Sequence, residues 1–329
     1  MIFAGVDGGA TRTRVVLASH DGFILGYGLA GPTNYDNVGV DEARSNLNRA
    51  LERAWMNSRR DREPVQAIFL GMAGVVSPHD REIIAGMARE IHAAPAAGIF
   101  VDHDIRIALA GGLAGDEGAV LIVGTGCSCY GRRADGRNHR TGWGYLLDDV
   151  GSGYYLGLQA MIALTREADG RGKPTSLSVD VRRALGFEHP DDIMRVLYHD
   201  NLSVTRIASL APHVLGAAGR GDEVAMDILR NGARELSLNV KAVADRLQFS
   251  APPFLVTIVG GLGETPGIYR QLICDAITRE IPHCTVVEPK LPPVLGAVLL
   301  AMENGGNAPA PSTAERLAEG AKDITWYAQ

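Results

Sequence analysis

The feature that most constrains this fold is a pattern of three strands and a glycine turn that occurs twice. In the first copy, a buried strand predicted over residues 2–6 runs into Asp-Gly-Gly at 7–9. Two further strands are predicted over 13–19 and 23–29, and Asp-Gly at 21–22 between them is a hairpin signal. This order predicts an antiparallel meander whose first strand ends in a flexible, exposed turn.

The second copy lies in residues 119–144. An apolar strand again meets a small-residue turn, Gly-Thr-Gly at 124–126, and Asp-Gly at 135–136 separates the next two strands. Two copies of one unit predict an α/β protein of two similar domains around a central cleft. Each domain is expected to hold a mixed sheet with an antiparallel meander, flanked by helices.

The rest of the chain supplies helices and buried strands. Apolar spacing and turn residues predict strands over 66–74, 98–102 and 253–261, and helices over 40–57, from Ser77-Pro78, over 104–113, through most of 155–248, and within 289–304. The predicted first domain is 1–113 plus 293–304. The second is 114–292, with a helical insertion at about 155–248. Residues 305–329 are expected to be a loosely held tail, either disordered or docked on the first domain.

Charge and composition exclude several classes of protein. The net charge is −6, and no strongly basic face is evident, which argues against a nucleic-acid partner. The chain has neither an apolar run long enough for a membrane helix nor a signal-peptide pattern. Four scattered cysteines do not make a disulfide framework, and no metal-ligand array accompanies them. We therefore expect a cytoplasmic protein.

The glycine turns predict a phosphate site. Backbone N–H groups at a strand end, with no side chain in the way, bind anions, and threonine hydroxyls add donors. Asp7 cannot bind phosphate directly, but it can hold Mg²⁺, usually through water. The turns at 7–9 and 124–126 are thus expected to lie on either side of a metal–polyphosphate. The alternative is that each glycine simply makes a tight turn.

Phosphoryl transfer to an alcohol also needs a base near the acceptor hydroxyl. Asp102 and Asp104 lie where the strand at 98–102 gives way to a helix. Either could cap that helix. Asp102 is the better cap candidate, and Asp104 is the better candidate for the base.

The order of motifs resembles a known family. In sequence they are "DGGATRTRVVL", "AGPTNYDNVG", "DIRIALAG", "VLIVGTG", "TGWGYLLDDVGSGYYLG", "VGGLGETPG" and "PPVLGAVLLA". Over residues 4–302 the chain resembles the BadF/BadG/BcrA/BcrD-type ATPases, and most of all their N-acetylglucosamine kinase branch. The resemblance implies two RNase-H-like domains, as in actin-like ATPases, and a homodimer.

The resemblance also implies roles for individual positions. It makes Asp104 the catalytic base and Asp7 the acid associated with Mg²⁺. It assigns ATP phosphate and adenosine contacts to Gly8, Gly9, Thr11, Gly124, Thr125, Gly126, Gly260 and Gly261. It assigns sugar contacts to Asn34, Asp104, Cys127, Ser128, Gly142, Trp143, Gly144 and Asp149. Three of these positions keep an alternative: Trp143 could be core, Asn34 a turn cap and Asp149 a surface acid.

Two departures from the family pattern fall at the implied sugar site. The usual "GDEGS" is here "DDVGS" at 148–152, so that Asp148 and Val150 replace a glycine and an acid. Cys127-Ser128 follows the second turn, where the branch often has a pair such as Ser-Asn. The iron–sulfur activators of the wider family need a cysteine set that this chain does not present.

The resemblance thus implies ATP-dependent phosphorylation of N-acetylglucosamine at its 6-hydroxyl. Glucosamine, N-acetylmuramate or another hexose stays open as the acceptor. Two other classes stay open as well: a sugar sensor without kinase activity, and an ATPase that drives a partner protein.

Overall fold

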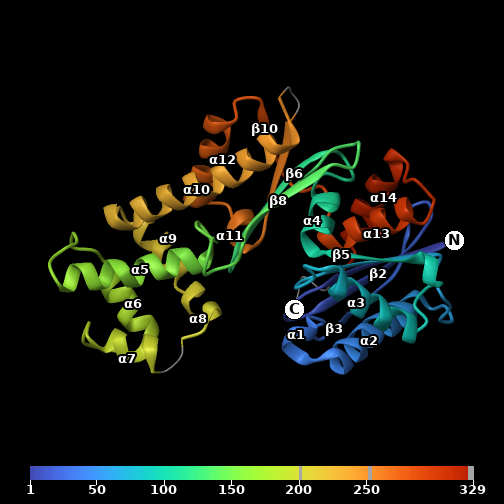
Figure 1. The fold of residues 1–329 in the computed structure, drawn as a ribbon, viewed down its shortest axis with the longest axis horizontal. Coiled ribbons are helices and arrows are strands. Elements are labelled where there is room, and N and C mark those ends of the chain that lie inside the picture. Colours follow the sequence, from blue (N-terminus) through green and yellow to red (C-terminus); the bar gives the residue numbers. More distant parts are fainter. Residues whose placement is uncertain (200–201, 251–253, 325–329) are drawn as a thin grey trace. The chain divides into compact units, whose positions relative to one another are not determined.

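The computed structural model describes residues 1–199, 202–250 and 254–324 (Figure 1). The chain divides into two compact units. The first contains Met1–Glu117 together with the chain from Glu288, and the second is Gly118–Val287. Each unit is built on a five-stranded mixed sheet.

The sheet of the first unit has the strand order β3-β2-β1-β4-β5. Its strands are β1 (Ile2–Gly8), β2 (Thr13–Ser19), β3 (Ile24–Ala30), β4 (Ala67–Met72) and β5 (Ile99–His103). The first three form the predicted antiparallel meander, and β4 and β5 run parallel to β1. The carboxyl ends of β1, β4 and β5 therefore lie at one edge of the sheet.

Helices cover both faces of this sheet because alternate strand residues are apolar on both sides. One face packs against α2 (Val40–Ser58) and α3 (Pro78–Glu90), and the other against α4 (Asp104–Gly112), α13 (Pro293–Asn304) and α14 (Pro311–Ala321). The short α1 (Tyr35–Val38) and the 3-10 turn η1 (Ala96–Gly98) complete the unit. The predicted start of α3 is confirmed: Ser77 and Asp80 form a reciprocal capping box, with proline at the first turn.

The sheet of the second unit has the order β10-β9-β6-β7-β8. Its strands are β6 (Gly118–Val123), β7 (Cys127–Arg132), β8 (Asn138–Thr141), β9 (Phe254–Val259) and β10 (Cys284–Val287). Strands β6, β7 and β8 form the predicted second meander, and β9 runs parallel to β6. One continuous apolar core joins the sheet to the helices of this unit.

Most of the second unit's helices lie between β8 and β9. They are α5 (Gly153–Ala168), α6 (Leu177–Leu185), α7 (Asp192–Tyr198), α8 (Val204–Ala208), α9 (Ala211–Gly219) and α10 (Glu223–Leu247), followed beyond β9 by α11 (Gly261–Glu264) and α12 (Ile268–Glu280). The predicted helical insertion thus consists of six helices in the described residues. No described helix is long and apolar enough to cross a membrane.

Of the two alternatives for the tail, the structure shows docking on the first unit for its described part. Residues 311–321 form α14, and its Leu317 is fully buried in the apolar core that also holds Val16 and Ala18 of β2. Trp326 and Tyr327 lie outside the described residues. Strand β10 and helix α12 were not predicted either, since their short or mixed patterns carry little periodic signal.

Candidate functional site

The predicted acids of the first unit gather at the carboxyl-end edge of its sheet. Strand register places Asp7 of β1 beside Gly71 of β4, and Gly71 beside Asp102 of β5. Asp104 follows two residues after Asp102, as the first residue of α4. Because the three strands are parallel, Asp7 and Asp104 lie at the same edge, separated by β4.

Asp7 is a mostly buried carboxylate with a cationic neighbour. Arg14 stands opposite Asp7 in the β1–β2 register, and its Nη1 donates to Asp7 Oδ2 at 3.0 Å. Burial raises the pKa of Asp7 above its ordinary value; the positive charge of Arg14 opposes this rise and the negative charge of Asp104 adds to it. A cation bound here would relieve the crowding of negative charge.

Asp104 is about one-third exposed, so its carboxylate can reach a ligand. The predicted helix cap is wrong: the N-cap of α4 is His103, whose Nδ1 lies 3.2 Å from the N–H of Ile105. The same nitrogen lies 2.5 Å from Asp104 Oδ1. Asp104 itself is the first residue of the helix.

Asp102 has a structural role instead of capping. Its carboxylate accepts from Arg81 of α3 at 2.9 Å, from Arg106 of α4 at 2.7 Å and from the N–H of His103 at 2.9 Å. Burial opposes ionisation, but the two arginines hold the pKa of Asp102 below its ordinary value. Asp102 therefore fastens the β5–α4 junction that carries Asp104.

Backbone hydrogen bonds hold the turn after β1, and the hydroxyl-bearing Thr11 in this turn is exposed. The N–H of Gly9 donates to Arg12 O at 3.0 Å, and Gly9 O accepts from Thr33 N–H at 3.2 Å. Thr11 is exposed, with no hydrogen bond from its hydroxyl in the described residues. A side chain at Gly8 would collide with Met72 and Thr33, so packing explains Gly8, whereas Gly9 faces only Arg12 O at 3.2 Å.

Asn34 adopts the alternative role considered for it. It is the N-cap of α1, and its side chain accepts from Asp36 N–H at 3.1 Å. It also lies close to Gly74, which follows β4. Asn34 is half-buried, so the cap fixes its position without hiding its amide.

The glycine turn of the second unit is anchored to the start of α5. Gly124 O accepts from Gly153 N–H at 2.8 Å, and Thr125 O accepts from Tyr154 N–H at 2.9 Å. Gly124 N–H closes the turn onto Gly126 O at 2.9 Å. The carbonyls are thus occupied by the protein, while the side chain of Thr125 stays exposed.

Asp149 supports this turn, so the surface-acid alternative is wrong. It is 7% exposed, and its Oδ1 accepts from Cys127 N–H at 3.2 Å. A methyl group on Gly126 would lie 2.6 Å from Asp149 Oδ2. Burial raises the pKa of Asp149; the bond from Cys127 opposes the rise and Asp148 adds to it. Asp149 also has a left-handed φ of 57°.

The third glycine turn lies beside the second. Register pairs Ile122 of β6 with Val259 of β9, so the turns that follow these two parallel strands are neighbours. Gly260 has a φ of 96°, and a methyl group there would meet Val123 O at 2.7 Å. Gly261, by contrast, faces open space: a methyl group added there would have no neighbouring protein atom within 4 Å.

The segment after β8 presents apolar side chains to solvent. Trp143 is 71% exposed, so the core alternative is wrong for it. Leu146 and Leu147 are also exposed. Gly142 has a φ of 97° and packs against Ser128, which connects this segment to the residues that follow the second turn. Cys127 is buried, and burial raises the pKa of its thiol, with Asp149 adding to the rise.

The space around Gly124 and Gly261 bears on whether a nucleotide fits these two turns. At Gly124 the nearest atom to an added methyl group is 4.0 Å away, and at Gly261 there is none within 4 Å. Neither φ is left-handed. The fold therefore does not require glycine at either position, and the space suits a phosphate that approaches the backbone closely.

The acidic side chains suit a Mg²⁺ ion that takes most of its ligands from water and substrate phosphates. No described group of three or more histidine, cysteine or acidic side chains could cage a metal ion. Mg²⁺ commonly keeps several waters and takes one or two carboxylates plus substrate phosphates. Asp7, at the glycine turn, is placed to serve as such a carboxylate ligand.

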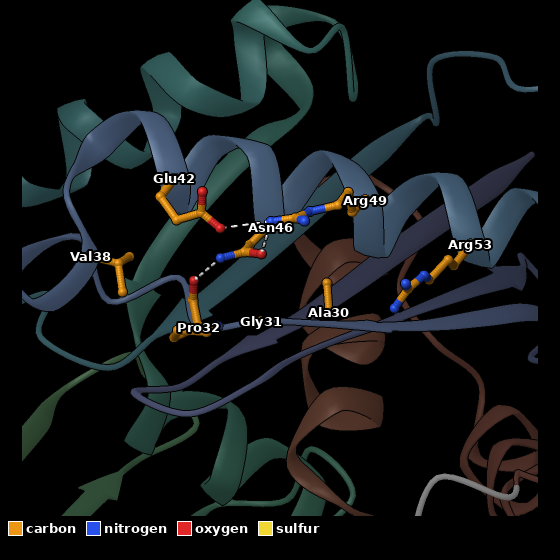
Figure 2. Close-up of a pocket in the computed structure, with 8 residues that line it drawn as sticks. All are labelled: Ala30, Gly31, Pro32, Val38, Glu42, Asn46, Arg49 and Arg53. Atoms are coloured by element: carbon orange, nitrogen blue, oxygen red, sulfur yellow. Dashed lines mark hydrogen bonds and ion pairs between the residues drawn. The ribbon is translucent and has the colours of Figure 1, made fainter.

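Two pockets of the described residues contain none of the predicted site residues. The one in Figure 2, about 330 Å³, lies between the end of β3 and α2. There Asn46 donates to Pro32 O at 2.8 Å and accepts from Arg49, which also pairs with Glu42 (Figure 2). The other, about 540 Å³, surrounds Asp222, whose carboxylate caps α10. The polar groups that define both pockets bond to protein.

Residues 4–301 match the BadF/BadG/BcrA/BcrD ATPase family. The chain belongs to this family. The sequence-based recognition and the predicted actin-like fold of two mixed sheets are confirmed.

Curated members of similar sequence are named as sugar kinases. An N-acetylmuramic acid/N-acetylglucosamine kinase of Clostridium acetobutylicum is 32% identical, covering 90% of this chain and 97% of that protein. An N-acetyl-D-glucosamine kinase of Dictyostelium discoideum is 29% identical, covering 92% and 98%. A crystal structure from Chromobacterium violaceum, provisionally named an N-acetylglucosamine kinase, has a TM-score of 0.71 at 27% identity and covers 91% and 98%. The predicted enzyme class agrees with these relatives.

Sequence reasoning missed two residues of the site. Arg14 could have been found, because the tight turn at residues 9–12 between β1 and β2 sets it opposite Asp7. His103 had no signal of its own: the cap was expected at Asp102, and one residue of difference in the strand end moved it.

Proposed function

We propose that this protein is an ATP-dependent kinase that phosphorylates the 6-hydroxyl of N-acetylglucosamine. The observation that carries the proposal is the pair of open glycines, Gly124 and Gly261, on neighbouring turns of an actin-like ATPase fold. The partly exposed carboxylate of Asp104, at the sheet edge of the first unit, supplies the base. Named relatives over nearly the full chain support a sugar acceptor.

The turns bind the nucleotide. Gly8, Gly9 and Thr11 form one phosphate loop, and Gly124, Thr125 and Gly126 form the other. Gly260 and Gly261 lie on the adenosine side. Asp7 holds Mg²⁺ through water, and the ion neutralises phosphate charge when bound.

Asp104 is the base in this proposal. Its carboxylate accepts the proton of the sugar hydroxyl as the hydroxyl oxygen attacks the γ-phosphorus and ADP leaves. General-base catalysis of this kind contributes about 10²–10⁴-fold in rate. The hydrogen bonds that Asp102 accepts from the N–H of His103 and from Arg106 keep the start of α4 fixed during this step.

The residues proposed to contact the sugar occur in each of the two units. Asn34 and Asp104 come from the first, and Cys127, Ser128, Gly142, Trp143, Gly144 and Asp149 from the second. Asp149 has a double task, since it also supports the turn at Cys127. With Asp148 and Val150 next to it, this region is where the choice among N-acetylglucosamine, N-acetylmuramate and glucosamine is made. A cytoplasmic homodimer remains a prediction.

The experiment that tests the proposal compares wild-type protein with Asp104→Asn. The variant keeps the size and hydrogen-bonding reach of the side chain but cannot take up the proton. We expect turnover with sugar to fall at least about 10²-fold, with ATP affinity unchanged. Turnover that persists in Asp104→Asn would rule out Asp104 as the base.

A further inference from the structure

We propose that Tyr35 is a positioning residue: its hydroxyl ties the loop that carries Asn34 to the start of α3 and so holds the Asn34 amide in place for a sugar hydroxyl. This inference rests on the proposed function, because it assigns Tyr35 a task through Asn34. The observation behind it is the hydrogen bond that the Tyr35 hydroxyl donates to Asp80 Oδ1 at 2.7 Å. Tyr35 begins α1 directly after Asn34, whereas Asp80 lies in the first turn of α3.

Asp80 is a fixed anchor for that hydroxyl. Its Oδ2 accepts from Val76 N–H at 2.9 Å and from Ser77 N–H at 2.7 Å, and Ser77 is the N-cap of α3. The bond from Tyr35, together with those from Val76 and Ser77, holds the pKa of Asp80 well below its ordinary value. The carboxylate is therefore ionised at neutral pH, and a hydroxyl bonded to an ionised oxygen is held more strongly than one bonded to a neutral acceptor.

The residue on the other side of Asn34 is attached as well. Thr33 is buried, and its N–H donates to Gly9 O at 3.2 Å in the turn after β1. The hydroxyl oxygens of Thr33 and Thr13 lie 2.9 Å apart. Asn34 thus stands between two polar attachments, and without the hydroxyl of Tyr35 only the one at Thr33 remains.

Asn34 keeps one donor group for a ligand. Its Oδ1 accepts from Asp36 N–H at 3.1 Å, while its Nδ2 donates to no group in the described residues. A methyl group at Gly74 would lie 3.2 Å from Nδ2, so the amide lies against the segment that follows β4. Asp80 accepts from the backbone of that same segment. The Tyr35–Asp80 bond therefore fixes the Asn34 loop relative to the surface on which the amide rests.

The test centres on Tyr35→Phe, which removes the hydroxyl and keeps the ring that packs against the apolar core of this unit. Ser77→Ala is the matched control, because it weakens the cap of α3 and leaves the Tyr35–Asp80 bond in place. Asn34→Ala, alone and combined with Tyr35→Phe, shows whether Tyr35 acts through Asn34. We measure kcat, KM for ATP, KM for N-acetylglucosamine and the melting temperature of each variant.

We expect Tyr35→Phe to raise the sugar KM about three- to tenfold, with kcat and the KM for ATP nearly unchanged. The reason is that a misplaced Asn34 amide weakens binding of the sugar and of the transition state alike. Ser77→Ala should lower the melting temperature at least as much as Tyr35→Phe and leave the sugar KM unchanged. In the Asn34→Ala background, Tyr35→Phe should cause no further rise in the sugar KM.

Three results would overturn the inference. They are a normal sugar KM in Tyr35→Phe, an equal rise in Ser77→Ala, which would reduce the effect to a loosened α3, and a further rise in the Asn34→Ala background, which would place the action of Tyr35 elsewhere. All three leave the sugar-dependent turnover of the wild-type protein intact. Wild-type protein with no such turnover would instead overturn the proposed function itself.

Discussion

Arg14 and Asp7 face each other across β1 and β2, and Arg14 Nη1 donates to Asp7 Oδ2 at 3.0 Å. In spite of this ion pair, burial keeps the pKa of Asp7 above its ordinary value of 3.8, and Asp104 adds to the rise. The folded chain therefore bears a cost for ionised Asp7 at neutral pH. That cost is expected at a site built to meet a cation, because functional groups are often placed where they reduce stability.

Asp7→Asn should make the ligand-free protein more stable at pH 7. A raised pKa in the folded state means that stability is lost as pH rises from about 3.8 through the folded pKa. The variant lacks this loss, and its amide oxygen still accepts from Arg14. We expect its melting temperature to exceed that of wild type by about 2–4 °C at pH 7, with the difference shrinking toward pH 4. Kinase activity should fall.

Asp102→Asn is a control variant, whose effect on stability at neutral pH should have the opposite sign. Its pKa is lowered in the folded state, so its contribution to stability is present above about 3.8 and disappears as pH falls through the lower, folded value. We expect a loss of about 1–3 kcal/mol at neutral pH, because Arg81 and Arg106 lose their charged partner. Melting curves from pH 3 to 8 measure both variants. If the melting-temperature differences of the two variants from wild type changed in the same direction with pH, the electrostatic account of this sheet edge would be wrong.

Two alanine substitutions in one turn separate ligand space from packing. At Gly124 a methyl group meets nothing nearer than 4.0 Å, whereas at Gly126 it would lie 2.6 Å from Asp149 Oδ2. Gly124→Ala should therefore weaken ATP binding about tenfold or more without lowering the melting temperature. Gly126→Ala should lower the melting temperature as well. Calorimetric ATP titrations and thermal melts decide the matter, and normal ATP affinity in Gly124→Ala would remove that turn from the nucleotide site.

Trp143 should report directly on sugar binding. It is 71% exposed, so Trp143→Ala should change the melting temperature by less than about 1 °C. Its effect should appear as a higher KM for sugar, because an aromatic face against a sugar ring contributes binding energy. Sugar should also change the tryptophan emission of wild type and not that of the variant. An unchanged KM would mean that the exposed segment serves something other than this substrate.

The strands and glycine turns were predictable because their signals are local. Alternating apolar residues and the Asp-Gly pairs at 21–22 and 135–136 specify both meanders, and the Ser77 cap specifies the start of α3. The positions of Asp7 and Gly124 at strand ends followed from the same pattern. The closeness of Asp7 to Asp104 within the first unit, and of Gly124 to Gly260 within the second, depends on parallel pairing between distant strands, which no local signal encodes.

The details of the site could not be predicted from the sequence, for a different reason. Whether Asp102 or His103 caps α4 depends on one residue at the end of β5, which is the least predictable part of any element. The same limit applies to Asp149, since only the fold shows that its carboxylate turns inward to Cys127. Trp143 is exposed, between two glycines with left-handed φ, which its hydrophobicity does not predict.

The most direct test of the central claim is ADP release from Mg²⁺·ATP in the presence of N-acetylglucosamine, N-acetylmuramate, glucosamine and glucose, with a sugar-free control and with Asp104→Asn. We predict fast release with N-acetylglucosamine, formation of its 6-phosphate in equal amount, and loss of both in the variant. ADP release that is the same with and without every sugar would contradict the account and indicate an ATPase that serves a partner. ATP binding without any ADP release would contradict it as well and indicate a sensor.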